Sequence, residues 1–167
     1  MSMTLDSLKK LYVHELKDLY SAENQILEAL PAMIEDASDA DLAAALEEHR
    51  RETERQVARL ESIFEGLEFE PRGHRCEGME GLLKEGKSAL RETSGGPVRD
   101  AAIIAGAQRV EHYEIAGYGT ARAYAEKLGD YRAADLLQES LDEEARADQK
   151  LSRLALRKIN FGAMKAA

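Results

Sequence analysis

Acidic side chains occupy positions in this sequence where the helical spacing of apolar residues predicts a buried face. Glu111 and Glu114 are three residues apart, and Glu144 and Asp148 are four apart, so each pair lies on one face of a helix. An ionised carboxylate is rarely buried unless it is paired or binds a metal ion. The two pairs therefore predict a metal site built from carboxylate groups.

Glu23 and Glu52 are predicted to join this site from two other helices. If a turn near residues 37–38 connects those helices in antiparallel fashion, Glu23 lies level with Glu52. The same reasoning around a turn near residues 129–130 aligns the acids of a second hairpin, Glu114 with Glu144 and Glu111 with Asp148. We expect both groups to meet at the middle of a bundle.

His49, one turn before Glu52, is expected to hydrogen-bond a carboxylate rather than to bind metal itself.

Six inward acids without an inward lysine or arginine would repel one another strongly, and a pair of divalent cations bridged by carboxylate oxygens would relieve that repulsion. Di-iron bundles commonly use a Glu-x-x-His pair on two of their helices. Here Arg55 and Ala147 stand at the histidine positions, so we expect Gln56 and Asp148, one residue later, to replace the histidines. Ligands that are mostly oxygen suit iron or manganese better than zinc.

The elements that must position these residues are all helices. Alanine, leucine, glutamate, lysine and arginine dominate the sequence, and runs of β-branched residues are scarce. The apolar periodicity predicts long helices over about 4–35, 39–66, 98–127 and 131–159, and a short helix over about 78–92. Two antiparallel hairpins joined by a long crossover with a short extra helix make an all-α, ferritin-like four-helix bundle. We expect one domain over residues 1–167.

The composition bears on the cellular context. The 167 residues carry a formal net charge of −9 and include one cysteine. Binding of nucleic acid is not expected, because an acidic chain lacks the clustered lysine and arginine that phosphates require. Without an apolar run of membrane-spanning length or a signal peptide, we expect a cytoplasmic protein that does not bind membranes. Cys76 is expected to be a packed thiol rather than a nucleophile.

The chain resembles the YciE/YciF group of ferritin-like proteins, and the resemblance extends over nearly its whole length. Ungapped blocks in all the expected helices carry it, namely DLYSAE at 18–23, CEGMEGL at 76–82, VRDAA at 98–102, QRVEHYEIA at 108–116 and YGT at 118–120. The resemblance implies a bacterial four-helix bundle with a dinuclear metal site, a short crossover helix, a homodimer and a link to stress responses. It leaves the reaction undefined.

Three functions are compatible with these features. The first is an oxidoreductase that holds two divalent ions, iron or alternatively manganese, and reacts with dioxygen or peroxide. Because the chain has no rubredoxin-like cysteine pair, such an enzyme would need a separate electron donor. The second is binding of iron without turnover. The third is a metal-free structural dimer, induced under stress, in which some of the buried carboxyl groups are protonated.

Overall fold

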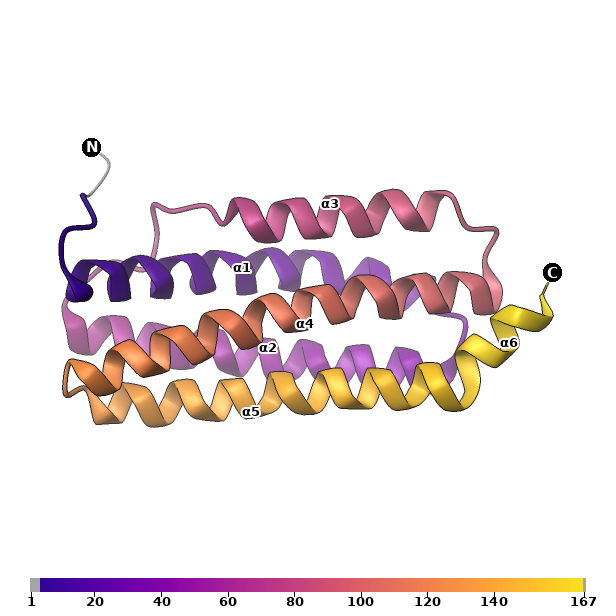
Figure 1. The fold of residues 1–167 in the computed structure, drawn as a ribbon. Coiled ribbons are helices and arrows are strands. Elements are labelled where there is room, and N and C mark those ends of the chain that lie inside the picture. Colours follow the sequence, from indigo (N-terminus) through magenta and orange to yellow (C-terminus); the bar gives the residue numbers. More distant parts are fainter. Residues whose placement is uncertain (1–3, 167) are drawn as a thin grey trace.

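Four long helices form a bundle in the computed structural model, which describes residues 4–166 (Figure 1). These helices are α1 (Leu8–Asp36), α2 (Ala40–Leu67), α4 (Gly96–Lys127) and α5 (Tyr131–Leu154). The shorter α3 (Glu77–Arg91) lies outside the bundle and packs on α4 and α1. The described residues contain no strand, so the predicted all-α bundle with a crossover helix is confirmed.

Each antiparallel hairpin has a short turn with a capped helix start. Asp39 precedes α2, and its carboxylate accepts hydrogen bonds from the backbone N–H groups of Asp41 and Leu42. In the second hairpin Gly129 has a φ of 80°, a left-handed conformation that glycine adopts without strain. Asp130 then caps α5 by accepting from the Ala133 N–H group. The two turns fix the register in which acids on paired helices meet.

The apolar core is divided into two halves by a polar layer at mid-bundle. One half includes Ile26, Leu46, Ile104 and Leu151, and the other includes Leu16, Leu60, Tyr118 and Leu137. On α2 and α5, the buried polar residues lie between the positions that contribute to the two halves. On α1 and α4, Glu23, Glu111 and Glu114 lie at the same boundary, whereas the buried Asp100 lies near the start of α4. The layer is therefore a feature of the whole bundle.

The C-terminal part of the chain differs from the single helix expected over 131–159. The α-helix α5 ends at Leu154, a π-helical turn η1 (Ala155–Ile159) follows, and α6 (Asn160–Lys165) bends toward the start of α4 at the end of the bundle (Figure 1). The wider turn keeps both Ala155 and Ile159 packed against the core. The other expected helices lie within about two residues of the observed ones, except at the N-terminus, where α1 begins at Leu8 rather than near residue 4.

None of the helices among residues 4–166 combines the length and the apolar composition needed to cross a bilayer.

Candidate metal centre

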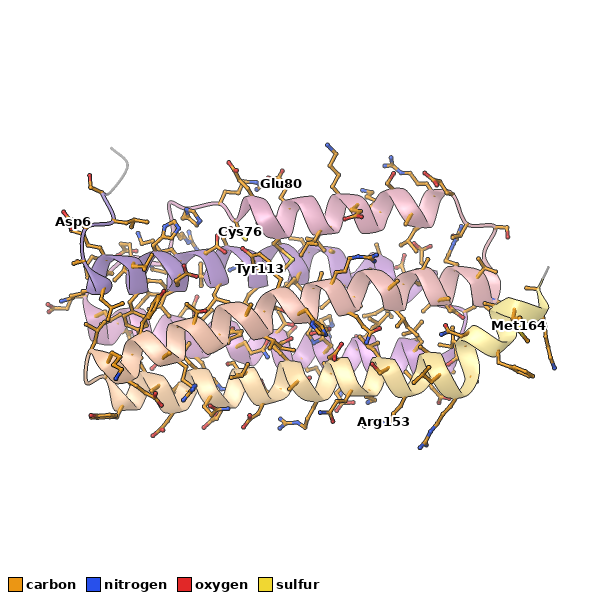
Figure 2. The ribbon with its side chains drawn as sticks, viewed as in Figure 1. Asp6, Cys76, Glu80, Tyr113, Arg153 and Met164 are labelled. Atoms are coloured by element: carbon orange, nitrogen blue, oxygen red, sulfur yellow. The ribbon has the colours of Figure 1, made fainter. Side chains whose placement is uncertain are left out.

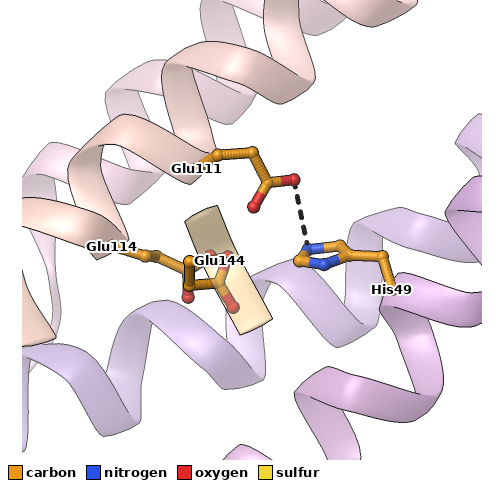
Figure 3. Close-up of side chains that lie close together, drawn as sticks. All are labelled: His49, Glu111, Glu114 and Glu144. Carbon is orange, nitrogen blue, oxygen red and sulfur yellow. Dashed lines mark ion pairs between the residues drawn. The ribbon is translucent and has the colours of Figure 1, made fainter. Parts of the chain in front are cut away.

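Three carboxylates and one imidazole converge in the polar layer. His49 comes from α2, Glu111 and Glu114 from α4, and Glu144 from α5. All four are buried, and each offers a ligand atom that lies within 4.8 Å of the others (Figure 3). His49 Nε2 lies 3.6 Å from Glu111 Oε1. We call these residues the His49 group.

Glu23 of α1 completes the layer from the fourth helix. Its side chain is fully buried, and Oε1 accepts a hydrogen bond from the hydroxyl of Tyr118. Burial raises the pKa of Glu23 well above its ordinary value, and the negative charge of Glu144 raises it further. The Tyr118 hydroxyl partly opposes this rise because it stabilises the ionised carboxylate.

Gln56 connects the layer to the neighbouring ion pair between Glu143 and Arg59. Its side-chain amide donates hydrogen bonds to Glu144 Oε1 and, at 3.1 Å, to Glu143 Oε2. Arg59 neutralises Glu143 through contacts of 2.7 and 3.0 Å. Burial raises the pKa of Glu143, but hydrogen bonds and charge from Arg59 outweigh that effect and leave it below the ordinary value. Glu144 is thus held in place by the neutral side-chain amide of Gln56 rather than by a lysine or arginine side chain.

Several buried ligand atoms in this layer have no hydrogen-bond partner among the described residues. They are Glu23 Oε2, both ring nitrogens of His49, Gln56 Oε1, Glu111 Oε2, both carboxylate oxygens of Glu114, and Glu144 Oε2. Burial is the main cause that raises the pKa of both Glu111 and Glu114 well above the ordinary value, with Glu144 contributing next. Buried acceptors without donors are costly, and a divalent cation satisfies several at once. The donor set therefore fits metal ions.

Glu52 and Asp148 lie outside the His49 group. Glu52 is partly buried, and Arg55 approaches its carboxylate to 4.0 Å. Asp148 Oδ1 accepts a hydrogen bond of 2.9 Å from Gln108 and lies 3.3 Å from His112 Nε2. Metal ligation by Glu52, Gln56 and Asp148, and by the acids that do converge, stays a prediction.

A small cavity leads from the surface toward the layer between α2 and α5. It has a volume of about 200 Å³, and its lining includes His49, Glu111 and Glu52. An ion pair between Lys150 and Glu48 lies in the same lining. The cavity gives solvent and small molecules a route to the imidazole.

The roles of two residues in or beside the polar layer, Tyr118 and Glu143, were not predicted from the sequence. Tyr118 lies four residues after Glu114 and so shares its helix face, a spacing that would have revealed the contact with Glu23. Glu143 precedes Glu144, and nothing in the sequence shows that it pairs with Arg59. His49 was expected to support a ligand, and its ring nitrogens lie among the candidate ligand atoms themselves.

Comparisons with known proteins agree with the bundle and its crossover helix. Residues 7–164 match the profile of a family described as a domain of unknown function, DUF892, and the chain belongs to this family. Protein YciF of Escherichia coli K12 is 40% identical over 159 residues, which cover 95% of this chain and 96% of YciF. The resemblance inferred from the sequence is confirmed.

Solved structures of relatives show the same fold. The crystal structure of the E. coli stress protein YciF matches with a TM-score of 0.89 and 40% identity, covering 93% of this chain and 99% of YciF. YcfI, described as a putative structural protein from Rhodopseudomonas palustris, matches with a TM-score of 0.87 and 43% identity, covering 91% of this chain and 97% of its own. The chain is thus similar in both sequence and structure to YciF-like stress proteins.

Proposed function

We propose that this chain holds two divalent metal ions in the polar layer, iron or alternatively manganese, and reacts with dioxygen or peroxide as part of a stress response. One observation carries the proposal, namely the set of eight buried ligand atoms that have no hydrogen-bond partner among residues 4–166. Oxygen atoms dominate this set, which suits iron or manganese. The role in stress is inferred from the description of YciF as a stress protein.

The residues of the chain divide into those that would hold the ions and those that orient them. Glu23, Glu111, Glu114 and Glu144 would supply carboxylate oxygens, and neither oxygen of Glu114 has a hydrogen-bond partner among the described residues. His49 would supply a ring nitrogen. When bound, such ions exchange electrons with dioxygen or peroxide.

The surrounding side chains fix these groups before any ion binds. The Tyr118 hydroxyl orients Glu23, and the Gln56 amide orients Glu144. The cavity beside His49 and Glu111 has a volume of about 200 Å³, smaller than the roughly 300–1,000 Å³ of typical organic-ligand pockets. Its size supports dioxygen or peroxide as the oxidant.

A second candidate is a metal-free structural protein. The raised pKa values of Glu23, Glu111 and Glu114 favour protonated, neutral carboxyl groups, which can be buried without cations. The description of the relative YcfI as a putative structural protein agrees with this candidate. A third candidate, binding of iron without catalytic turnover, shares the metal site with the oxidoreductase and the lack of a reaction with the structural protein.

Metal analysis separates these candidates. Protein purified from cells grown with iron and manganese is analysed by mass spectrometry for bound metal, next to Glu114→Gln and the exposed control Glu65→Gln. We expect two ions per chain in the wild type and the control, and fewer in Glu114→Gln. No metal above background in the wild type, together with failure to take up added Fe²⁺, would contradict the metal proposal.

Reaction of the ferrous protein with peroxide then separates turnover from storage. An oxidoreductase gives repeated oxidation of Fe²⁺ by added peroxide when a chemical reductant is present, whereas a storage role gives a single oxidation. The physiological electron donor is proposed to be a separate protein, because Cys76 is the one cysteine of the sequence and a rubredoxin-like site needs cysteine pairs. A homodimer is proposed on the family resemblance, and light scattering coupled to size-exclusion chromatography tests it.

A further inference from the structure

A series of side chains able to bind metal connects the surface with the polar layer, through the cavity between α2 and α5. Glu48, Glu52, His49 and Glu111 all line this cavity. The exposed fraction of their side chains falls in that order, from 60% to 14%, 7% and 2%. The cavity thus presents carboxylates and an imidazole at increasing depth. We call these four residues the entry series.

The periodicity of α2 places three of the four side chains along one strip of the helix. Glu48 and Glu52 are four residues apart, and His49 and Glu52 are three apart. Glu111 follows from α4, and its Oε1 lies 3.6 Å from His49 Nε2 (Figure 3). The strip on α2 therefore leads to the imidazole and, next to it, to the acids of the layer.

The remaining acids of the layer are closed to solvent. Glu23, Glu114 and Glu144 are fully buried, whereas His49 keeps a small exposed surface in the lining of the cavity. An ion that passes through the cavity meets His49 and Glu111 before it reaches the fully buried acids. His49 is suited to receive it, because neither of its ring nitrogens has a hydrogen-bond partner among the described residues.

Glu52 is placed to bind an ion in transit rather than to hold it. Its carboxylate lies outside the His49 group, so it does not converge with the other candidate ligands. Arg55 lies 4.0 Å from this carboxylate, but its own side chain is mostly in solvent and competes weakly for it. A single carboxylate attracts a divalent cation, whereas tight binding takes several ligands at once.

The charges along the cavity favour inward movement of a cation. Three cationic residues of α5 line the opposite wall at spacings of four and three, namely Arg146, Lys150 and Arg153. Both arginines are exposed, so water and salt screen their charge at the mouth. Glu52 and Glu111 lie deeper, where screening is weaker, and buried charges of one sign concentrate ions of the opposite sign.

Lys150 occupies the outermost member of the series. Its ammonium group pairs with the Glu48 carboxylate, and both side chains are well exposed. An exposed ion pair contributes little free energy, so Lys150 can leave Glu48 when a divalent cation approaches. While the pair is closed, however, Glu48 is engaged and the positive charge of Lys150 opposes entry.

We propose that divalent metal ions enter and leave the polar layer along the entry series, with Glu52 as a transit ligand and the pair between Lys150 and Glu48 as a gate. The inference rests on the proposed function, since it concerns traffic to the same metal site. Glu48 attracts the ion, Glu52 holds it briefly, and His49 receives it. A transit ligand lowers the barrier equally in both directions, so it changes the rates of uptake and release but not the affinity.

Rates of Mn²⁺ exchange test the transit role of Glu52. Loaded protein is mixed rapidly with excess fluorescent chelator, which gives the release rate, and equilibrium competition with the same chelator gives the affinity. We expect Glu52→Gln to slow release about tenfold and to change the affinity less than twofold. The exposed control Glu65→Gln on the same helix should change neither. Circular dichroism checks that the variants remain folded.

Two further variants test the gate and the passage. Lys150→Gln should speed uptake and release about threefold, because Glu48 is then unpaired, whereas the exposed control Lys127→Gln should not. Ala147→Phe should slow both rates because the ring narrows the cavity, whereas Ala58→Phe on the exposed surface of α2 should not.

Failure of the entry series is distinguishable from failure of the metal site. If the wild type binds no Mn²⁺, the metal site and the entry series are both overturned. If the wild type binds Mn²⁺ but Glu52→Gln lowers the affinity about tenfold, Glu52 is a resident ligand. If Glu52→Gln and Ala147→Phe leave the rates unchanged, ions enter elsewhere. Either of the last two results would overturn the entry series and leave the metal site in place.

Discussion

The ring of Tyr113 lies against the backbone of Gly78, so closely that a Cβ atom on residue 78 would lie 2.7 Å from Tyr113 Cε2. Tyr113 has little freedom to move, because its hydroxyl donates a 2.5 Å hydrogen bond to Asp18. The hydroxyl also lies 3.0 Å from Sγ of Cys76, which is labelled beside Tyr113 in Figure 2. His74 Nε2 lies 2.8 Å from the other oxygen of Asp18. The contact between Gly78 and Tyr113 therefore joins α3 to α4, and the hydrogen bond from Tyr113 to Asp18 joins both helices to α1.

Substitution of Gly78 by alanine is expected to destabilise the protein by about 1–3 kcal/mol, because the new methyl group overlaps the Tyr113 ring. Gly81→Ala in the same helix is the matched control. A Cβ atom at residue 81 meets nothing within 4 Å, so we expect stabilisation of about 0.5–1 kcal/mol from helix propensity. Urea unfolding followed by circular dichroism measures both. Equal effects of the two substitutions would show that the ring does not limit residue 78.

Asp39→Ala is expected to lower the free energy of unfolding by about 1 kcal/mol, because the cap of α2 is lost. Asp41→Ala should cost less, about 0.3–0.5 kcal/mol, since Asp41 pairs with the same Lys158 but does not cap the helix. A result in which Asp41→Ala costs as much as Asp39→Ala would assign the effect to the ion pair instead.

The contribution of Asp39 is also expected to depend on pH. A hydrogen bond from Lys158 and, next among the favourable contacts, those from the α2 backbone hold the pKa of Asp39 below its ordinary value of 3.8. A lowered pKa means that the stabilisation is present above the unfolded-state pKa and is lost as the pH falls through the folded-state pKa. The difference in unfolding free energy between wild type and Asp39→Ala should therefore shrink between about pH 7 and about pH 3. A constant difference would contradict this account.

Tyr118→Phe is expected to weaken metal binding about tenfold while the bundle remains folded, because Glu23 loses its only hydroxyl donor among the described residues. Tyr131→Phe is the control, since Tyr131 is exposed on α5. Competition with a fluorescent chelator measures the affinity for Mn²⁺. Unchanged affinity in Tyr118→Phe would mean that Glu23 needs no orientation, or that it is not a ligand.

Asp148→Asn is expected to reduce metal affinity less than Glu144→Gln does, because Gln108 and His112 already engage the Asp148 carboxylate. Glu144 instead belongs to the His49 group. The same chelator competition compares the two variants. If Asp148→Asn is the more damaging, Asp148 turns inward when metal binds, as the sequence alone predicts.

Periodicity and turn positions were sufficient to predict the bundle and the level at which the acids lie. Glu114 and Glu144 meet because both lie at about the same number of residues from the turn at Gly129. The spacing did not determine which way each carboxylate turns. Asp148 is level with Glu111 but bonds to Gln108, whereas Glu111 lies beside His49. Helix rotation and rotamer choice decide such details, and neither follows from residue spacing.

The end of the bundle was less predictable. Neither glycine nor proline marks the π-helical turn at Ala155–Ile159, so the apolar pattern of α5 gave no sign of a change in helix type. The ion pair between Glu143 and Arg59 was not predicted either, because an acid next to a core position is normally solvated.

The division of the apolar core implies that the two ends of the molecule are separate cooperative units. Four helices cross the boundary, but the side chains at the boundary are polar or acidic, so they contribute little apolar packing between the two halves. Binding of ions at the boundary would couple the two ends, and amide hydrogen exchange in the presence of a chelator would then show each end opening with its own free energy.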